Sequence, residues 1–316
     1  MKRNLRILFM GTPEFAVATL KTLIEHDYNI VGVITAPDKP AGRGQKLHES
    51  DVKKYAQSQN LKILQPTNLK SEPFIEELKS LNANLQIVVA FRMLPEVVWN
   101  MPKYGTFNLH ASLLPNYRGA APIHWVIING ETKTGVTTFF IDEKIDTGAI
   151  ILQKETDIAA NETVGSLHDR LMTIGSQLVI DTVKLIETDK ATTSLQPKTA
   201  INKTAYKLHK DNCKIDWNAS LDTIYNKIRG LNPFPTAWSY LKTNNEMLNV
   251  KIFDVEKEFN KHSDPIGLLK SSKTELKVAV KDGYLIIKEI QLPGKRKMAV
   301  KSLLNGFHFS EEAKML

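Results

Sequence analysis

Cysteine is almost absent from this sequence of 316 residues, because Cys213 is the single one. One thiol excludes a disulfide framework within the chain and a cluster of cysteine metal ligands. Long apolar runs are also missing. The apolar run at residues 7–10 follows a basic start but is too short for a signal peptide, and no segment approaches the length of a membrane span. We therefore expect a cytoplasmic protein.

Several motifs of common enzyme classes are missing as well. The first apolar stretch ends in Gly11-Thr12-Pro13 rather than in the glycine-rich GxGxxG turn, which argues against a dinucleotide site. Ser112 lacks the context of a nucleophile elbow, which argues against a serine hydrolase. His and Asp residues show no metal-ligand spacing, so we expect no bound metal.

The first two thirds of the chain carry almost no net charge, whereas the last third has an excess of cations. Residues 1–206 carry 23 Lys and Arg against 21 Asp and Glu, whereas residues 207–316 carry 19 against 13, which gives most of the net charge of +8. An excess of cations favours a polyanionic partner such as nucleic acid or an anionic membrane. A surface charged only for solubility explains the count equally well.

Short apolar runs alternate with longer amphipathic segments in the first half. This alternation predicts an α/β fold, with a Rossmann-like, mostly parallel sheet that carries helices on both faces. The expected strands are residues 5–10, 30–35, 62–64, 85–91, 106–110, 136–141 and 149–154. The expected helices are residues 13–25, 51–58, 72–81, 121–128 and 164–187.

The character of the sequence changes after Lys207. Short β-type runs at residues 247–255, 276–280, 284–291 and 298–300 are separated by Gly, Pro, Asp and Lys, and a helical stretch at 221–229 precedes them. This pattern is typical of a small β-barrel or sandwich. We therefore expect a catalytic domain at residues 1–188, a linker at 189–206 and a C-terminal domain at 207–316.

A polar pair lies near the end of one expected strand. Asn108 and His110 are two residues apart, so their side chains share one face, and Asp146 follows a later strand from which it could reach the same crevice. Asn can donate to a developing oxyanion, His can carry a proton, and Asp can orient the His. A structural His and a simple Asp-Thr-Gly turn are the alternatives.

The residues around this pair resemble a known family. Asn108-Leu-His110, Ser112-Leu-Leu-Pro115 and Arg118-Gly-Ala-Ala-Pro122, together with motifs near residues 9–15, 37–44 and 214–217, resemble the formyltetrahydrofolate-dependent formyltransferases, in particular those acting on methionyl-tRNA. The resemblance runs from residue 5 to about residue 306. It implies a C-terminal barrel of the OB type, 10-formyltetrahydrofolate as formyl donor, initiator methionyl-tRNA as acceptor and no metal.

The resemblance also assigns residues. Asn108, His110 and Asp146 match the catalytic residues, and the folate-binding segment matches Ser112, Leu113, Leu114 and Pro115. The loop at residues 40–46 matches the segment that contacts tRNA, in which Arg43 and Lys46 supply cations. The charge count adds Lys295 and Lys297 as expected tRNA contacts. We expect the protein to act as a monomer without a membrane partner.

Some features leave alternatives open. Arg92 stands where the family more often has glycine after an aromatic residue, so it could reshape the wall of the folate pocket. An amino-sugar formyltransferase or a formyltetrahydrofolate hydrolase would use the same three polar residues. A non-catalytic RNA-binding protein would use only the barrel. The basic loop and the basic C-terminal region favour the tRNA acceptor.

Overall fold

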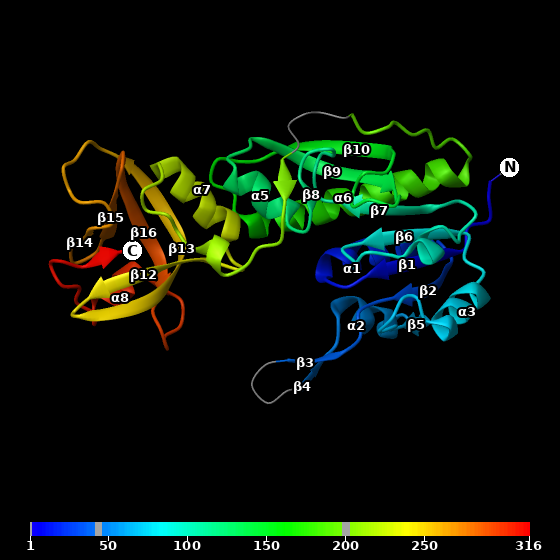
Figure 1. Ribbon diagram of the computed structural model, residues 1–316, viewed down its shortest axis with the longest axis horizontal. Helices are drawn as coiled ribbons and strands as arrows, with labels where there is room; N and C mark the ends of the chain where they lie inside the picture. Colours follow the sequence, from blue (N-terminus) through cyan, green and yellow to red (C-terminus); the bar gives the residue numbers. More distant parts are fainter. Residues whose placement is uncertain (1, 42–45, 198–202) are drawn as a thin grey trace. The chain divides into compact units, whose positions relative to one another are not determined.

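The computed structural model describes residues 2–41, 46–197 and 203–316 (Figure 1). The chain forms two compact units, each made of segments that are not continuous in sequence. The first comprises Met1–Gly119, Thr134–Thr156 and His168–Thr204, and the second comprises Ala120–Lys133, Asp157–Leu167 and Ala205–Leu316. The expected division into a catalytic domain at residues 1–188, a linker at 189–206 and a C-terminal domain at 207–316 stays a prediction. No helix among the described residues has the length and apolar character needed to cross a membrane.

A seven-stranded sheet forms the centre of the first unit, in the order β10-β9-β7-β6-β1-β2-β5. The pairs of β1 with β2 and β6, of β2 with β5, and of β6 with β7 are parallel, and β9 runs antiparallel to β7. The mostly parallel sheet predicted from the sequence is therefore confirmed. Its strands are β1 (Ile7–Gly11), β2 (Ile30–Ile34), β5 (Ile63–Leu64), β6 (Leu85–Val89), β7 (Thr106–His110), β9 (Lys133–Phe140) and β10 (Ile150–Asp157).

Helices cover both faces of this sheet. Helix α3 buries Phe74 and Leu78 in one cluster with Met10 and Val88. Helix α6 approaches the opposite face so closely that a Cβ at Gly175 would lie 2.9 Å from Leu109. The remaining elements are α1 (Glu14–Glu25), β3 (Lys39–Ala41), β4 (Lys46–His48), α2 (Asp51–Ser58), α3 (Glu72–Ser80), α4 (Glu96–Trp99), β8 (Arg118–Gly119) and α6 (Val164–Glu187).

The strand order reverses between β1 and β6. Strands β2 and β5 extend the sheet on one side of β1, and β6 and β7 extend it on the other. Ligands of open α/β sheets bind beyond the carboxyl ends of the strands at such a switch point. The carboxyl end of β7, which carries Asn108 and His110, lies next to this point.

An antiparallel sheet forms the core of the second unit, in the order β14-β15-β16-β13-β12-β18. Backbone hydrogen bonds from Leu269 to Ala313 and from Met315 to Gly267 connect its two ends, so the sheet is nearly closed and the predicted barrel is confirmed. Its elements are α5 (Pro122–Ile128), β11 (Thr204–Ala205), the 3₁₀ turn Asp211–Cys213, α7 (Leu221–Leu231), β12 (Ala237–Thr243), β13 (Glu246–Phe259), β14 (Leu269–Ser271), β15 (Leu276–Val280), β16 (Gly283–Gln291), β17 (Met298–Ala299), α8 (Val300–Leu304) and β18 (Lys314–Met315).

Gly135 on β9 provides a test of the packing between strands. A Cβ at this position would lie 2.2 Å from the carbonyl oxygen of Lys154 and 2.6 Å from Leu113, so β10 would have to move. We expect Gly135→Ala to lower the free energy of unfolding by about 3 kcal/mol. Gly306→Ala is the control, because no atom lies within 4 Å of its added Cβ. Urea unfolding of both variants measures the difference, and equal midpoints would contradict the packing described.

Candidate functional site

Strand β7 presents two polar side chains on one face. His110 ends the strand and is 6% exposed, whereas Asn108 is half-buried and pairs in register with Val88 of β6. Among the described residues, the amide of Asn108 has no hydrogen-bond partner. A partly exposed amide without an internal partner remains available for a ligand.

Two loops fix the ring of His110. Its Nε2 lies 2.9 Å from the carbonyl oxygen of Tyr117, and its Nδ1 lies 3.8 Å from Oδ2 of Asp146. Because a carbonyl oxygen can only accept, Nε2 carries the proton of the neutral ring and Nδ1 keeps its lone pair. The distance to Asp146 is too long for a direct hydrogen bond, a gap that is common at catalytic pairs before the substrate binds.

Asp146 lies in the loop between β9 and β10 and has a left-handed backbone with φ of +55°. Its Oδ2 accepts a hydrogen bond of 2.8 Å from the backbone N–H of Gly119, and its side chain is 15% exposed. Two residues later, Gly148 cannot be replaced without strain, since a Cβ there would lie 1.7 Å from the carbonyl oxygen of Phe140. The loop therefore holds the carboxylate in one place.

The turn of residues 117–119 joins these groups. Tyr117 contributes the carbonyl that accepts from His110, and Gly119 contributes the N–H that donates to Asp146. Tyr117 also has a positive φ of +61°. The turn and the Asp146 loop therefore each contain one left-handed residue with a Cβ.

Gln196 is a residue of this region that sequence reasoning missed. It lies in the segment expected to serve as a linker, yet its amide contacts Arg118, Asp146 and Gly148. No periodicity marks the segment, and a single Gln carries no pattern. The neighbouring Arg118 belonged to a recognised motif, although its contact with Gln196 could not be predicted.

Three polar side chains fix the backbone of the segment proposed for folate and of the residues next to it. Oγ of Ser112 donates to the carbonyl of Asn116, and the hydroxyl of Thr137 donates to the carbonyl of Ser112. Gln153 donates to the carbonyl of Leu114, which is 4% exposed. Leu113 and Pro115 are half-buried, so the segment offers a fixed, partly exposed apolar wall. Such a wall suits a flat aromatic ring.

Arg92 follows β6 and connects two loops. Its guanidinium donates to the carbonyl oxygens of Pro66 and Thr67 and lies 5.7 Å from the ring of Phe91. The side chain therefore ties the loop after β5 to the loop after β6. The expectation that Arg92 shapes a folate pocket stays a prediction.

The basic loop lies between β3 and β4. Arg43 is outside the described residues, and Lys46 begins β4 but nothing is described of its side chain. At the base of this hairpin, Asp38 accepts hydrogen bonds from Lys53 and Gln65, which lower the pKa of its carboxyl group below the usual value. The base of the loop is therefore anchored by a charged contact to α2.

The two lysines expected to contact tRNA differ in their surroundings. Lys297 forms an ion pair of 2.7 Å with Glu289, whereas Lys295 lies 5.9 Å from the ring of Phe307. Lys295 has no carboxylate partner among the described residues. Its charge is therefore the more available of the two for a phosphate.

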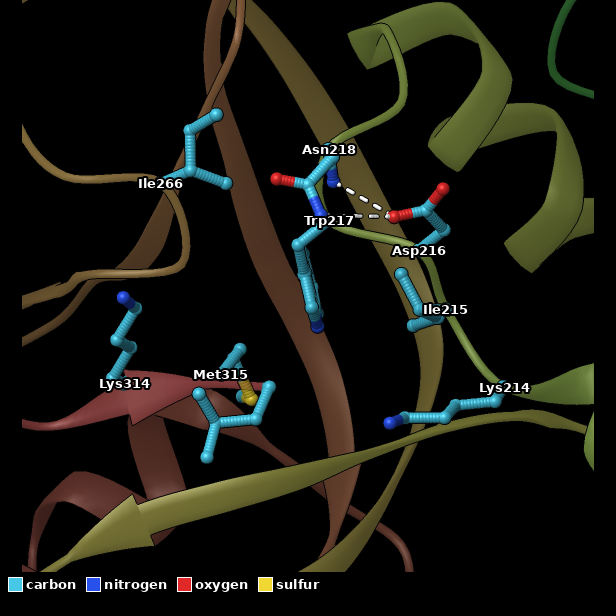
Figure 2. A pocket seen from close by; sticks show the side chains of 9 residues that line it. Lys214, Ile215, Asp216, Trp217, Asn218, Ile266, Lys314 and Met315 are labelled. Carbon is cyan, nitrogen blue, oxygen red and sulfur yellow. Dashed lines mark hydrogen bonds between the residues drawn. The ribbon is translucent and has the colours of Figure 1, made fainter.

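A cavity of about 660 Å³ opens on the barrel near the start of β18 (Figure 2). Buried Ile215, Trp217 and Met315 contribute to its lining. Figure 2 shows the side chains of Lys214 and Lys314 on either side of Trp217 in this view. Neither lysine forms an ion pair with a carboxylate in the described part of the chain. The lining therefore combines these two cations with the carboxylate of Asp216.

The side chains near the end of β7 can support the attack of a nucleophile on a carbonyl carbon. Asn108 can donate to an oxygen that gains charge, and Nδ1 of His110 can take a proton while Asp146 stabilises the resulting cation. No cluster of three or more His, Cys, Asp or Glu residues able to hold a metal occurs in the ranges described. The expected absence of metal stays a prediction.

Two family models match the chain in order. The model described as formyl transferase matches residues 4–183, and the one described as formyl transferase, C-terminal domain, matches residues 207–308. A protein of Flavobacterium johnsoniae named methionyl-tRNA formyltransferase is 62% identical over 312 residues, 99% of each chain. A protein of the same name from Bacteroides thetaiotaomicron is 51% identical over 99% of each chain.

Solved structures share the fold at low identity. The sugar 3N-formyltransferase WlaRD, crystallised with dTDP and 5-N-formyltetrahydrofolate, has a TM-score of 0.63 and 24% identity, over 93% of this chain and all of its own. HypX from Aquifex aeolicus, in complex with tetrahydrofolic acid, has a TM-score of 0.63 and 17% identity, over 96% of this chain and 47% of its own.

The contact between His110 and Tyr117 predicts which tautomer the neutral ring of His110 adopts. We expect neutral His110 to carry its proton on Nε2, because the carbonyl of Tyr117 accepts from that atom at 2.9 Å. The ¹⁵N chemical shifts of selectively labelled histidine, assigned with a His110→Gln variant, distinguish the two tautomers. A protonated Nδ1 in the neutral ring would show that the turn at residue 117 does not hold His110 as described.

Proposed function

Because this chain belongs to the formyl transferase family, where it groups with the methionyl-tRNA formyltransferases, we propose that it takes the formyl group from 10-formyltetrahydrofolate and delivers it to the amino group of initiator methionyl-tRNA. Membership of that group makes the chain a transferase that formylates methionyl-tRNA for the initiation of translation. The single observation that carries the proposal is the 62% identity with a methionyl-tRNA formyltransferase over 99% of both chains.

The proposed mechanism assigns a role to each of three side chains. The deprotonated amine of the acceptor attacks the formyl carbon, and negative charge develops on the formyl oxygen. Asn108 donates a hydrogen bond to that oxygen, since its amide lies on the same face of β7 as His110 and has no partner among the described residues. The amine loses one proton as the new C–N bond forms, and the leaving nitrogen of the donor gains one.

His110 and Asp146 would carry this proton. Nδ1 of His110 is the ring nitrogen that keeps its lone pair, because Nε2 donates to Tyr117. Asp146 faces Nδ1 at 3.8 Å and stabilises the imidazolium while the proton is held. The side chain of His110 can then carry the proton from the amine to the leaving nitrogen.

The donor supplies an activated formyl group and must be held beside β7. The fixed apolar segment of Ser112, Leu113, Leu114 and Pro115 supports the proposal that it takes the flat ring of the folate, because Thr137 and Gln153 hold its backbone in place. The structural relatives WlaRD and HypX were crystallised with tetrahydrofolate compounds, which agrees with this donor class.

The acceptor would contact both the basic loop and the barrel. Arg43 and Lys46 are the proposed contacts in the loop, and Lys295 and Lys297 are those on the barrel. Lys297 would have to exchange its ion pair with Glu289 for a phosphate, so Lys295 is the stronger candidate. A monomeric state and a cytoplasmic location stay predictions.

An acceptor assay with a labelled formyl donor tests the proposed function. We expect label to enter charged initiator tRNA faster than charged elongator tRNA, and not to enter a nucleotide amino sugar. A buffer sample without acceptor measures release of formate to water. Preferred transfer to the amino sugar, or release that matches the rate with tRNA, would overturn the proposal in favour of a sugar formyltransferase or a hydrolase.

Substitution of the three side chains tests the mechanism. Asn108→Ala should lower kcat on the order of 10²–10³-fold through loss of an oxyanion donor. His110→Ala and Asp146→Ala should each lower kcat by roughly 10²–10⁴-fold through loss of proton transfer. Turnover is measured with both substrates saturating, and circular dichroism checks the fold. A residue whose variant keeps wild-type turnover has no place in the mechanism.

Substitution of Arg43 tests the proposed acceptor loop. Arg43→Ala should raise the KM for methionyl-tRNA by about tenfold, the order expected for one lost phosphate or base contact. Donor affinity should stay unchanged, because the loop follows β3 whereas the proposed folate segment follows β7. Lys261→Ala, at an exposed position, is the control for a lost surface charge. Equal changes for donor and acceptor, or no change for either, would remove the loop from tRNA recognition.

A further inference from the structure

The side-chain amide of Gln196 uses its whole hydrogen-bonding capacity at the candidate site. Its Nε2 donates to the carbonyl oxygens of Asp146 and Gly148, both at 2.9 Å. Its Oε1 accepts from Nε of Arg118 at 3.1 Å and from Nη2 at 2.5 Å. The two donors and two lone pairs of one amide therefore connect two separate loops.

The partners leave one orientation for this amide. A guanidinium can only donate and a backbone carbonyl can only accept, so the oxygen of Gln196 must face Arg118 and the nitrogen must face the Asp146 loop. A Glu at this position could still accept from Arg118, but it could not donate to either carbonyl. The hydrogen bonds to Arg118 and to the Asp146 loop together therefore require an amide side chain as long as that of Gln.

One of the two accepting carbonyls belongs to Asp146 itself, and the other belongs to Gly148, two residues later. Asp146 has a left-handed φ of +55°, a conformation that Asp adopts more readily than most residues with a Cβ but that still costs more than the right-handed one. Its carboxylate is fixed separately by the N–H of Gly119, the residue that follows Arg118. Gln196 thus holds the backbone of Asp146 and, through Arg118, the turn that holds the carboxylate.

Gln196 is itself placed by the strand that follows the Asp146 loop. Ser194 and Ile150, the first residue of β10, exchange two backbone hydrogen bonds of 2.8 and 2.9 Å. Gln196 is half-buried two residues further on. Its backbone is therefore anchored close to the loop that its side chain contacts.

We propose that Gln196 is a positioning residue for the reaction: it holds Asp146 in the left-handed conformation that directs the carboxylate toward His110. The inference rests on the proposed function, because it gives Asp146 the role assigned there. It predicts that loss of the amide nitrogen impairs turnover and leaves the binding of both substrates intact.

Gln196→Glu tests this role most sharply, since it keeps the side-chain length and the contact with Arg118 but removes both donations. We expect kcat to fall roughly 10²-fold, the effect of a misplaced catalytic group. The KM values for the folate donor and for methionyl-tRNA should stay within about twofold. Gln57→Glu, at an exposed position on α2, controls for the added charge and should keep wild-type turnover. Wild-type kcat in Gln196→Glu would overturn the inference.

A double-mutant cycle separates positioning from general damage. In single-turnover assays with excess enzyme, adding Gln196→Glu to Asp146→Ala should lower the rate by less than about twofold, because Asp146 is no longer there to be positioned. A second full loss in that background would show that Gln196 does not act through Asp146. Wild-type turnover in Asp146→Ala alone would overturn the role proposed for Asp146, and this inference with it.

A second variant keeps the test independent of folding. If Gln196→Glu does not fold, Gln196→Met provides a side chain of similar length without a donor or a charge. Its thermal midpoint is compared with that of wild type, and the same loss in kcat is expected at an unchanged midpoint. A folded Gln196→Met enzyme with wild-type kcat would contradict the proposal.

Discussion

The hydrogen bonds of one short turn, residues 117–119, determine the geometry of the whole candidate site. The carbonyl of Tyr117 accepts from His110, and the N–H of Gly119 donates to Asp146. These two backbone groups point the ring and the carboxylate toward each other, although the residues lie 36 positions apart in sequence. Because Nε2 makes the contact with the backbone, Nδ1 of His110 stays available for the proton transfer proposed above.

The sheet explains why the turn lies where it does. The carboxyl end of β7 adjoins the switch point between β1 and β6. Strand β9 runs antiparallel to β7, and Asp146 in the loop that follows β9 lies 3.8 Å from His110. Parallel strands place their following loops on one side of the sheet, which puts the end of β7 beside the ends of β1 and β6. The barrel of the second unit has its own buried core and carries lysines of its own, which suits a separate task in binding a polyanion.

Much of this arrangement could be predicted from the sequence. The spacing of Asn108 and His110 gave their common face, and the alternation of apolar runs gave the central sheet. Strand β12 was not predicted, although its residues Trp238 and Leu241 are buried. The ion pair of Lys297 with Glu289 and the contacts of Gln196 depend on tertiary packing, which no local pattern encodes. The periodic pattern of apolar residues indicates which face of a helix or strand is buried. It does not indicate which carbonyl oxygen a side chain contacts.

A crystal structure of the protein with a non-transferable formylfolate analogue tests the central claim most directly. We expect the formyl oxygen to lie within hydrogen-bond distance of Asn108, Nδ1 of His110 to face the formyl group, and Gly119 still to donate to Asp146. The folate ring should contact residues 112–115. A formyl group bound away from β7, or an Asp146 carboxylate that has left Gly119 and turned from His110, would show that these residues do not form the catalytic site.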